Sequence, residues 1–362
     1  MSGYFLLRKG EFAYNKSTST DSPWGAIKRL EKYDMGCVST LYICFELLSG
    51  DPDFLVTYYE TDRWYKAVQL IAAEGARNHG LLNIAPDDFF ETQICIPKRI
   101  DEQRQIGAFF DRLDSLITLH QRKYDKLCVL KKSMLDKMFP KGGSLYPEIR
   151  FAGFTDPWEQ RKLEDYVVVS TAKNVDGRFN KEDVLSVSGE YGIVNQIAFQ
   201  GRSFAGSSVL NYGIVNTGDI VYTKSPLNSN PYGIIKVNKG IPGIVSTLYA
   251  VYRPQDNVHT NFIQVYFEQH ERMNNYMHPL VNKGAKNDMK VTAENALKGV
   301  VTFPSREEQV IISEFFDRLD SLITLHQRKY DGCANPLFLE RRISCRKPSH
   351  QNRCSATTTP SG

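Results

Sequence analysis

The chain contains a long stretch in which apolar residues return at helical spacing. Ring or apolar side chains fall every seven residues, and others lie three or four residues beyond them; the first series is Ile106, Leu113, His120, Leu127 and Met134. This spacing is typical of an amphipathic helix with a heptad seam. Pro97 precedes the stretch, and Pro140 with a Gly-Gly pair follows it. We therefore predict one helix from Asp101 to Phe139, about 55 Å long at ~1.5 Å per residue.

Part of this stretch occurs twice. The 17 residues FFDRLDSLITLHQRKYD run from Phe109 to Asp125 and again, without a single difference, from Phe315 to Asp331. A core requires an apolar pattern rather than identical surface charges, so identity on every face indicates a duplicated unit. The second copy keeps the heptad phase and predicts a second long helix.

Shorter matches extend the duplication upstream of each identical segment. The small drift in their separation fits insertions in loops. The matched pairs are KGEFAYNKS with TGDIVYTKS, PWGAIK with PYGIIK, VSTLY with VSTLY, EGARN with KGAKN, and IPKRIDEQ with FPSREEQ. The chain thus holds two copies of one module, each a variable region followed by a helical segment.

The variable region is clearest in the second copy. Residues 158–303 alternate short apolar runs with Gly and Asn, which is typical of strands joined by turns. Thr260–Met277 has helical spacing and predicts a helix capped by Thr or Asn. The shared VSTLY predicts a buried strand. The module is expected to be α+β.

The two long helices are expected to pack against each other. No short loop returns a helix of this length onto its own domain, and two copies related by pseudo-symmetry favour an antiparallel coiled-coil pair. A separate core helix in each domain is the alternative, which the length and the heptad regularity disfavour. The predicted helix-pair residues are Ile106, Phe110, Leu113, Leu116, Ile117, Leu127, Ile312, Phe316, Leu319 and Leu322.

Composition and charge narrow the class of protein. No run approaches the ~18 apolar residues of a membrane span, and the N-terminus lacks the apolar core of a secretory signal. We therefore expect a cytoplasmic protein without membrane contact. The net charge of +4 is carried by residues 332–362, so bulk charge gives no argument for nucleic acid. The seven cysteines form no CxxC pair, which argues against a zinc knuckle.

The two-module plan, the linker after the first helix and the repeated FFDRLDSLITLHQRKYD together resemble the specificity subunit of a type I restriction–modification system. Over about residues 1–331, the resemblance implies two α+β target-recognition domains, the first incomplete, separated by long helical spacers that pair as an antiparallel coiled coil. The implied boundaries are 1–97 for the C-terminal part of the first recognition domain, 98–140 for the first spacer, 141–157 for a linker, 158–303 for the second recognition domain, 304–331 for a shortened second spacer, and 332–362 for an aberrant, disordered tail.

The resemblance also implies a division of labour. The chain would read a bipartite target in double-stranded DNA and hold modification and restriction subunits, without being an enzyme itself. It would bind no cofactor, because S-adenosylmethionine, ATP and Mg²⁺ would be held by the partner subunits that methylate adenine and cleave DNA. The shortened chain could also self-associate. Recombination through the repeated segments would explain why 17 residues stay identical.

Two stretches of the second copy are candidates for DNA contact. Readers of DNA place Lys and Arg on phosphates and polar side chains on base edges, and TKSPLNSNPYGIIK and KGAKNDMK offer both kinds. A structural turn with solvated lysines is the alternative. The candidate DNA-binding residues are Lys224, Ser225, Asn228, Tyr232, Lys283, Lys286, Asn287 and Lys290 in the second copy and Lys16, Arg77 and Asn78 in the first.

Catalytic motifs occur only as near-misses. SNPYG lacks one proline of the loop of amino-methyltransferases, and GRSFAGSS has Ser207 where a phosphate-binding loop has lysine. We predict no catalytic or metal-binding residue, which favours a binding protein. Two alternatives stay open: a coiled-coil remnant of a silent cassette that binds only the modification subunit and no DNA, and a standalone methyltransferase.

Overall fold

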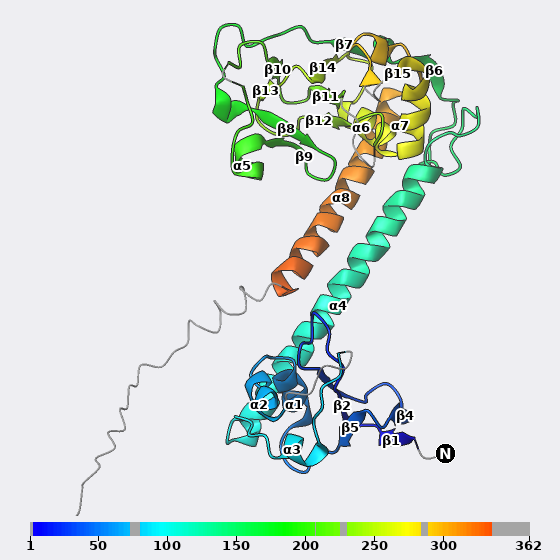
Figure 1. The fold of residues 1–362 in the computed structure, drawn as a ribbon. Helices are drawn as coiled ribbons and strands as arrows, with labels where there is room; N and C mark the ends of the chain where they lie inside the picture. The colour runs from blue at the N-terminus through cyan, green and yellow to red at the C-terminus, as the bar shows by residue number, and fades with distance from the viewer. Residues whose placement is uncertain (1–2, 73–79, 207, 225–229, 284–288, 335–362) are drawn as a thin grey trace, which may run out of the picture. The chain divides into compact units, whose positions relative to one another are not determined.

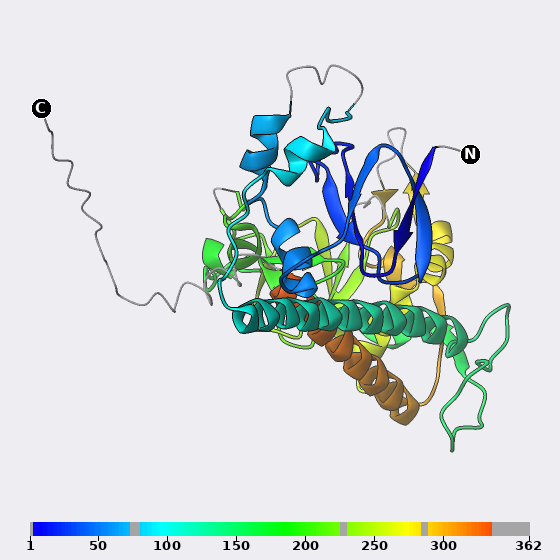
Figure 2. The same cartoon turned by 90° about the horizontal axis from the view of Figure 1, so that it is seen from below.

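The structure is a computed structural model that describes residues 3–72, 80–206, 208–224, 230–283 and 289–334. The chain divides into two compact units (Figures 1 and 2). The first unit comprises residues 1–121 and 329–362, and the second comprises residues 122–328.

The first unit is a small α+β body built on a three-stranded antiparallel sheet in the order β3-β2-β5, beside a β1–β4 ribbon. Tyr14 in the middle of the sheet packs on Phe89 and Trp64, with ring centroids 5.0 and 5.8 Å away. Asp51 begins α1, because its carboxylate accepts a hydrogen bond from the Phe54 amide. The elements are β1 (Tyr4–Arg8), β2 (Phe12–Asn15), β3 (Ala26–Arg29), β4 (Met35–Ser39), β5 (Tyr42–Phe45), α1 (Pro52–Tyr59), α2 (Tyr65–Ile71) and α3 (Pro86–Phe90).

The second unit repeats this plan with more strands. Its main sheet has the order β12-β11-β14-β7, and β6–β17, β8–β9, β10–β13 and β15–β16 form separate pairs. The strands are β6 (Glu159–Lys162), β7 (Val167–Val169), β8 (Leu185–Ser188), β9 (Gly192–Asn195), β10 (Gly213–Val215), β11 (Ile220–Thr223), β12 (Ile235–Val237), β13 (Gly243–Val245), β14 (Tyr249–Pro254), β15 (Asn282–Lys283), β16 (Met289–Lys290) and β17 (Val300–Phe303). The shorter helices are α5 (Gln196–Gln200), α6 (Thr260–Glu268) and α7 (His270–Met277), with 3-10 turns at Leu163–Asp165, Lys181–Asp183, His278–Leu280 and Asn295–Leu297.

The three strands β3-β2-β5 and the three strands β12-β11-β14 are the same substructure. Ala13 faces Lys28 in one sheet, and Val221 faces Lys236 in the other. Each hairpin turns at a glycine of positive φ, where a Cβ would overlap a backbone carbonyl across the hairpin. The duplication seen in the sequence is therefore a duplication of the fold.

The two long helices are α4 (Ile100–Lys137) and α8 (Arg306–Ala334), and α4 confirms the helix predicted from the heptad pattern. A glutamine fixes each helix to its own unit. Gln103 donates to the Pro97 carbonyl and accepts from the Asp51 amide at the start of α1. Gln309 makes the matching bonds, to the Pro304 carbonyl and from the His259 amide before α6.

The end of α4 and the beginning of α8 share the core of the second unit. Phe139, just beyond α4, is 1% exposed, and its ring centroid lies 6.3 Å from that of the fully buried Phe316. Figure 1 shows these two segments running in opposite directions. The core side chains that they supply are Leu135, Met138, Phe139, Ile312, Phe316 and Leu319. Pairing along the whole length of the heptad seam stays a prediction.

The helix predicted over Thr260–Met277 is wrong in detail. Gln269 has extended backbone angles and separates α6 from α7. Its side-chain amide donates to Asp136, and α7 then carries Arg272 over the Phe139 ring, 4.3 Å from its centroid. The cap is His259, whose side chain makes no capping bond. The break thus depends on partners more than 100 residues away, which helical spacing does not report.

The prediction of a buried strand at VSTLY is also wrong. In both copies this sequence joins two strands through a turn, from β4 to β5 and from β13 to β14. The leucine at each turn, Leu41 or Leu248, is 51% or 63% exposed. The turn therefore exposes the leucine, while Val245 at the start of the second copy is fully buried in β13.

Candidate nucleic-acid interface and helix anchor

The two predicted DNA-contact stretches of the second unit lie in two separate connections between strands. One is the connection from β11 to β12, and the other is the β15–β16 hairpin. The Tyr232 ring in the first stretch packs edge-on against His278, four residues before β15, at 6.2 Å between centroids. The Tyr222 hydroxyl donates to the Tyr232 carbonyl and holds the connection against the sheet. This ring contact links the described end of the first stretch to the 3-10 turn His278–Leu280, which precedes the second stretch.

In the first unit, backbone contacts link the loop after β2 to the residues that follow EGARN. Ser17 forms a β-bridge with Leu81, and the Thr18 amide donates to the Gly80 carbonyl at 2.6 Å. The loop after β2 is therefore bonded directly to the residues that follow the EGARN sequence.

The structure describes only some of the predicted DNA-binding residues. Lys16 donates its amine to the Ile84 carbonyl at 3.2 Å, so it also holds the loop. Lys224 is partly buried, and its side chain forms no ion pair with another described residue, whereas Tyr232 is partly buried against the core. Of Lys283 and Lys290 the backbone alone is described, in β15 and β16. The residues outside the described ranges are Ser225, Asn228, Lys286, Asn287, Arg77 and Asn78.

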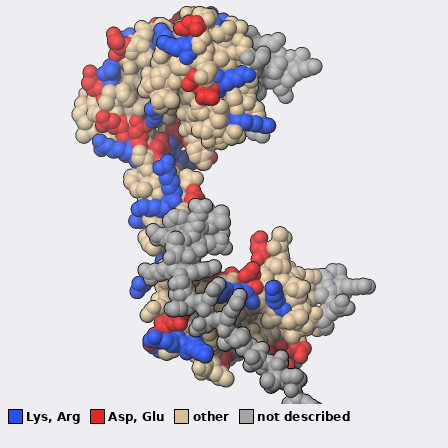
Figure 3. All heavy atoms as spheres, turned by 90° about the vertical axis from the view of Figure 1, so that its left-hand side faces the viewer, with Lys and Arg blue, Asp and Glu red and all other residues tan. Residues whose placement is uncertain are grey.

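Charge on the second unit is mixed. On the face shown in Figure 3, Lys and Arg side chains are interspersed with Asp and Glu. Affinity for DNA would therefore depend on particular loops and not on a uniform basic surface. This agrees with the neutral charge of most of the chain.

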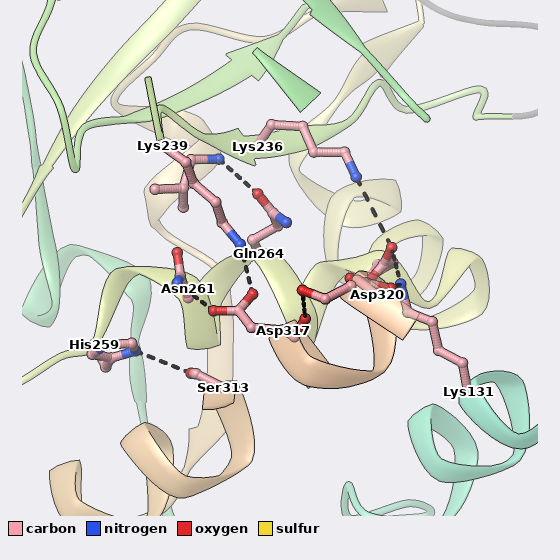
Figure 4. A network of polar contacts seen from close by, with 12 residues as sticks. Lys131, Lys236, Lys239, His259, Asn261, Gln264, Ser313, Asp317 and Asp320 are labelled. Atoms are coloured by element: carbon pink, nitrogen blue, oxygen red, sulfur yellow. Dashed lines mark hydrogen bonds and ion pairs between the residues drawn. The ribbon is translucent and has the colours of Figure 1, made fainter. Parts of the chain in front are cut away.

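A network of ion pairs anchors α4 and α8 to the main sheet of the second unit (Figure 4). Lys131 of α4 lies between two carboxylates, 2.8 Å from Glu268 of α6 and 2.6 Å from Asp320 of α8. Its side chain is 15% exposed. Burial lowers the pKa of Lys131, but the two carboxylates outweigh it and the net shift is upward. One lysine therefore links three helices.

A second lysine reaches the same site from the sheet. Lys236 of β12 is 4.0 Å from Glu268 and only 9% exposed. Burial lowers the pKa of this lysine, although Glu268 opposes the shift. One Glu268 oxygen is buried without a hydrogen-bond partner. A partly buried charge cluster of this kind specifies one arrangement of its helices, because removing one member leaves another charge unpaired.

Further polar contacts continue along α8. Asp317 accepts from Lys239 at 2.6 Å and from Asn261 at 2.8 Å. One turn earlier, the Ser313 hydroxyl lies 3.0 Å from Nδ1 of His259. Burial, reinforced by the charge of Arg306, lowers the pKa of His259. These contacts fix the rotation of α8 against the second sheet.

The predicted helix-pair residues fall into two groups. Ile312, Phe316 and Leu319 are buried in the second unit's core, and Leu127 packs against it. The remaining positions are partly buried or exposed: Ile106, Phe110, Leu113, Ile117, Leu116 and Leu322. Only Ile106 of this group contacts the core of the first unit. The role of the others in a helix pair stays a prediction.

Sequence reasoning missed the anchor and the two glutamines. A signal was present, because Lys28 and Lys236 match across the copies, and so do Glu60 and Glu268, at the same separation of 208 residues. Gln103 and Gln309 also stand at matching places in IPKRIDEQ and FPSREEQ. Charged residues retained in both copies are candidates for structural ion pairs, and retained amide residues are candidates for structural hydrogen bonds.

Among the described residues, no group of three or more His, Cys, Asp and Glu side chains is arranged to hold a metal ion. None of the described helices combines the length and the apolar character that crossing a membrane requires.

Comparison with known families identifies the second module. Residues 155–332 match the family model of the type I restriction modification DNA specificity domain. This part of the chain belongs to that family. The specificity domain spans the second predicted recognition domain and the second predicted spacer, and its family is one that recognises DNA sequences.

One solved structure has the same fold, and two others are more distantly similar. The S subunit of a type I restriction–modification system from M. genitalium shares 12% identity at a TM-score of 0.54, over 90% of this chain and 80% of that one. The HsdS subunit of Thermoanaerobacter tengcongensis has 17% identity and a TM-score of 0.42, over 93% and 79%. A chain from a structure of complex assembly and conformational transition in the type I R-M system shares 14% identity at a TM-score of 0.44. The match covers 95% of this chain and 83% of that one. No curated protein matches the chain.

Proposed function

We propose that this chain is a DNA sequence-recognition and scaffold subunit of a type I restriction–modification complex. The match of residues 155–332 to the specificity domain carries this proposal. The duplicated sheet supports it, because two copies of one module are what the reading of a bipartite target requires. Partner subunits would hold S-adenosylmethionine, ATP and Mg²⁺ and would methylate adenine and cleave DNA.

Methylation mapping tests the proposal directly. The chain is co-expressed with a modification subunit encoded beside it, and adenine methylation is read by long-read sequencing against a strain that lacks only this chain. A methylated motif that appears only with the chain supports sequence recognition. Soluble, associated proteins without any motif would favour the coiled-coil remnant that binds no DNA.

The loops can be tested separately from assembly. We expect Lys224→Gln to weaken duplex binding by the complex and to reduce the slope of log K against log salt by about 0.9, the effect of one lost phosphate contact. Lys181→Gln is the matched control, because Lys181 is an exposed lysine in the 3-10 turn Lys181–Asp183, outside both predicted DNA-contact stretches. Identical slopes for the two variants would show that Lys224 does not contact phosphate.

A further inference from the structure

The segment that follows α4, residues 141–157, is folded back onto the second unit. The sequence predicts only a linker here. In the structure, the Ile149 amide donates to the Lys137 carbonyl in the last turn of α4. The Trp158 amide, directly after the linker, donates to the Leu145 carbonyl, and both bonds are 2.9 Å long. The linker therefore forms a loop that returns to the end of the helix it leaves.

A buried ion pair fastens the linker to α8. Arg150 donates from Nε and Nη2 to the two carboxylate oxygens of Glu308, both at 2.8 Å. The Arg150 side chain is 14% exposed and that of Glu308 is 1% exposed. Two parallel bonds between a guanidinium and a carboxylate fix direction as well as distance. The Phe151 ring adds a contact with Phe315 of α8, at 5.8 Å between centroids.

The residue that ends the linker completes the core around the end of α4. The Trp158 ring is almost fully buried and meets Phe139 edge-on at 5.8 Å and Phe262 of α6 at 6.0 Å. Phe139 in turn packs on Phe316 of α8. The end of α4 is thus held by the linker on one side and by α8 on the other.

The helix α4 belongs to both units. Its residues up to Gln121 group with the first unit, and those from Arg122 onward group with the second. Its beginning lies close against α1 of the first unit, because a Cβ on Gly107 would come within 2.7 Å of the Phe54 amide nitrogen. A packed helix is a rigid element that transmits displacement along its length. The direction in which the second unit holds the end of α4 therefore matters to the first unit.

We propose that the Arg150–Glu308 pair is a positioning element for a bipartite target, an inference that rests on the proposed function. The pair holds the end of α4 in one direction on α8 and so restricts the separation at which the two modules meet DNA. In this role Arg150 acts through α4 and needs no contact with DNA. Without the pair, α4 would sample more directions, and the complex would accept half-sites at more than one spacing.

Binding to duplexes of different spacing tests this role. The complex of the chain with a modification subunit is titrated with three duplexes that carry the motif found by methylation mapping. One has the native spacing between half-sites, and the others have one base pair added or removed. The wild-type complex should prefer the native spacing, and Arg150→Met should reduce the ratio of Kd values at least about fivefold. The native duplex should bind only a few-fold more weakly, because the loosened helix must be ordered on binding.

Two further variants separate positioning from folding. Arg150→Met leaves Glu308 as a buried, unpaired charge, which destabilises the unit. Arg150→Met combined with Glu308→Met removes both charges, so the unit should stay folded and yet lose the same preference for spacing. Lys137→Gln is the matched control, because it removes only the exposed ion pair of Lys137 with Glu148 of the same linker. This change should leave the ratio of Kd values unchanged.

Equal weakening of all three duplexes by Arg150→Met would overturn the positioning role, because a loss of stability alone lowers every affinity and leaves the ratio unchanged. An unchanged ratio in the folded double variant would overturn it as well, and so would a wild-type complex that binds all three spacings equally. A wild-type complex that binds no motif refutes the proposed function itself. The two failures are therefore distinguished by the wild-type complex.

Discussion

The two copies of FFDRLDSLITLHQRKYD provide a test of what tertiary packing contributes. Phe110 and Phe316 are each preceded by a phenylalanine and followed by the same 15 residues, while Gly107 and Ala108 are replaced by Ser313 and Glu314, so local interactions in the unfolded chain are similar for them. Phe316 is 0% exposed beneath Phe139, whereas Phe110 is partly buried outside the first core. Replacing each with alanine compares one residue in two environments.

The expected difference is large. Truncating a fully buried phenylalanine costs about 3–5 kcal/mol, because transfer and cavity contributions add. For Phe110→Ala we expect a loss of stability of about 1 kcal/mol, since Phe110 is only partly buried and its truncation leaves no closed cavity. The difference of about 2 kcal/mol or more corresponds to ~30-fold in an opening equilibrium.

Native-state hydrogen exchange measures each unit separately, which a single denaturation curve of two units does not. Phe316→Ala should accelerate exchange of β11 and β14 amides by at least ~30-fold. Phe110→Ala should change β2 and β5 only a few-fold. Equal losses in the two units would refute the assignment of Phe316, and not Phe110, to a closed core.

Three further predictions use single sites of the second unit. Gly233→Ala should cost about 2 kcal/mol, because Gly233 has a φ of 77° and a Cβ would overlap the Thr223 carbonyl; Gly240→Ala, which has room, is the thermal-melt control. Because burial lowers the pKa of His259 below its ordinary 6.5, the unfolded chain binds the proton first on acidification. Stability should therefore fall as the pH drops through 6.5, and His259→Gln should reduce that fall between pH 7.5 and 5.5. Lys131→Met should destabilise the unit by about 2 kcal/mol in urea, since it leaves two carboxylates without their shared cation; an unchanged midpoint would show that the anchor is dispensable.

Much of the fold could be predicted from the sequence, because it is indicated either by residue spacing within one element or by a stretch of residues that occurs twice. Heptad spacing predicted α4 from Asp101 to Phe139, and the helix runs over Ile100–Lys137. The repeated segment predicted α8. The shorter matches between the two copies predicted that the module occurs twice. Each of these inferences needs only the order of residues along one element.

The features that the sequence did not predict depend on contacts between residues far apart in the chain. The break at Gln269 follows from packing against Asp136 and Phe139, which lie more than 100 positions away. The anchor is a similar case, because Lys131 and Lys132 are adjacent and chemically identical. Only the fold shows that Lys131 meets two carboxylates while Lys132 is exposed.

The repeated segment also constrains how this protein can change. Each of its positions must satisfy two surroundings, because Phe110 meets partial cover and Phe316 a closed core. Wherever copying between the two gene segments transfers a substitution, the stricter environment decides its fate. A polar residue tolerated at position 110 would be eliminated through its effect at 316. With such copying, the phenylalanine at position 110 would be retained because of the closed core around position 316.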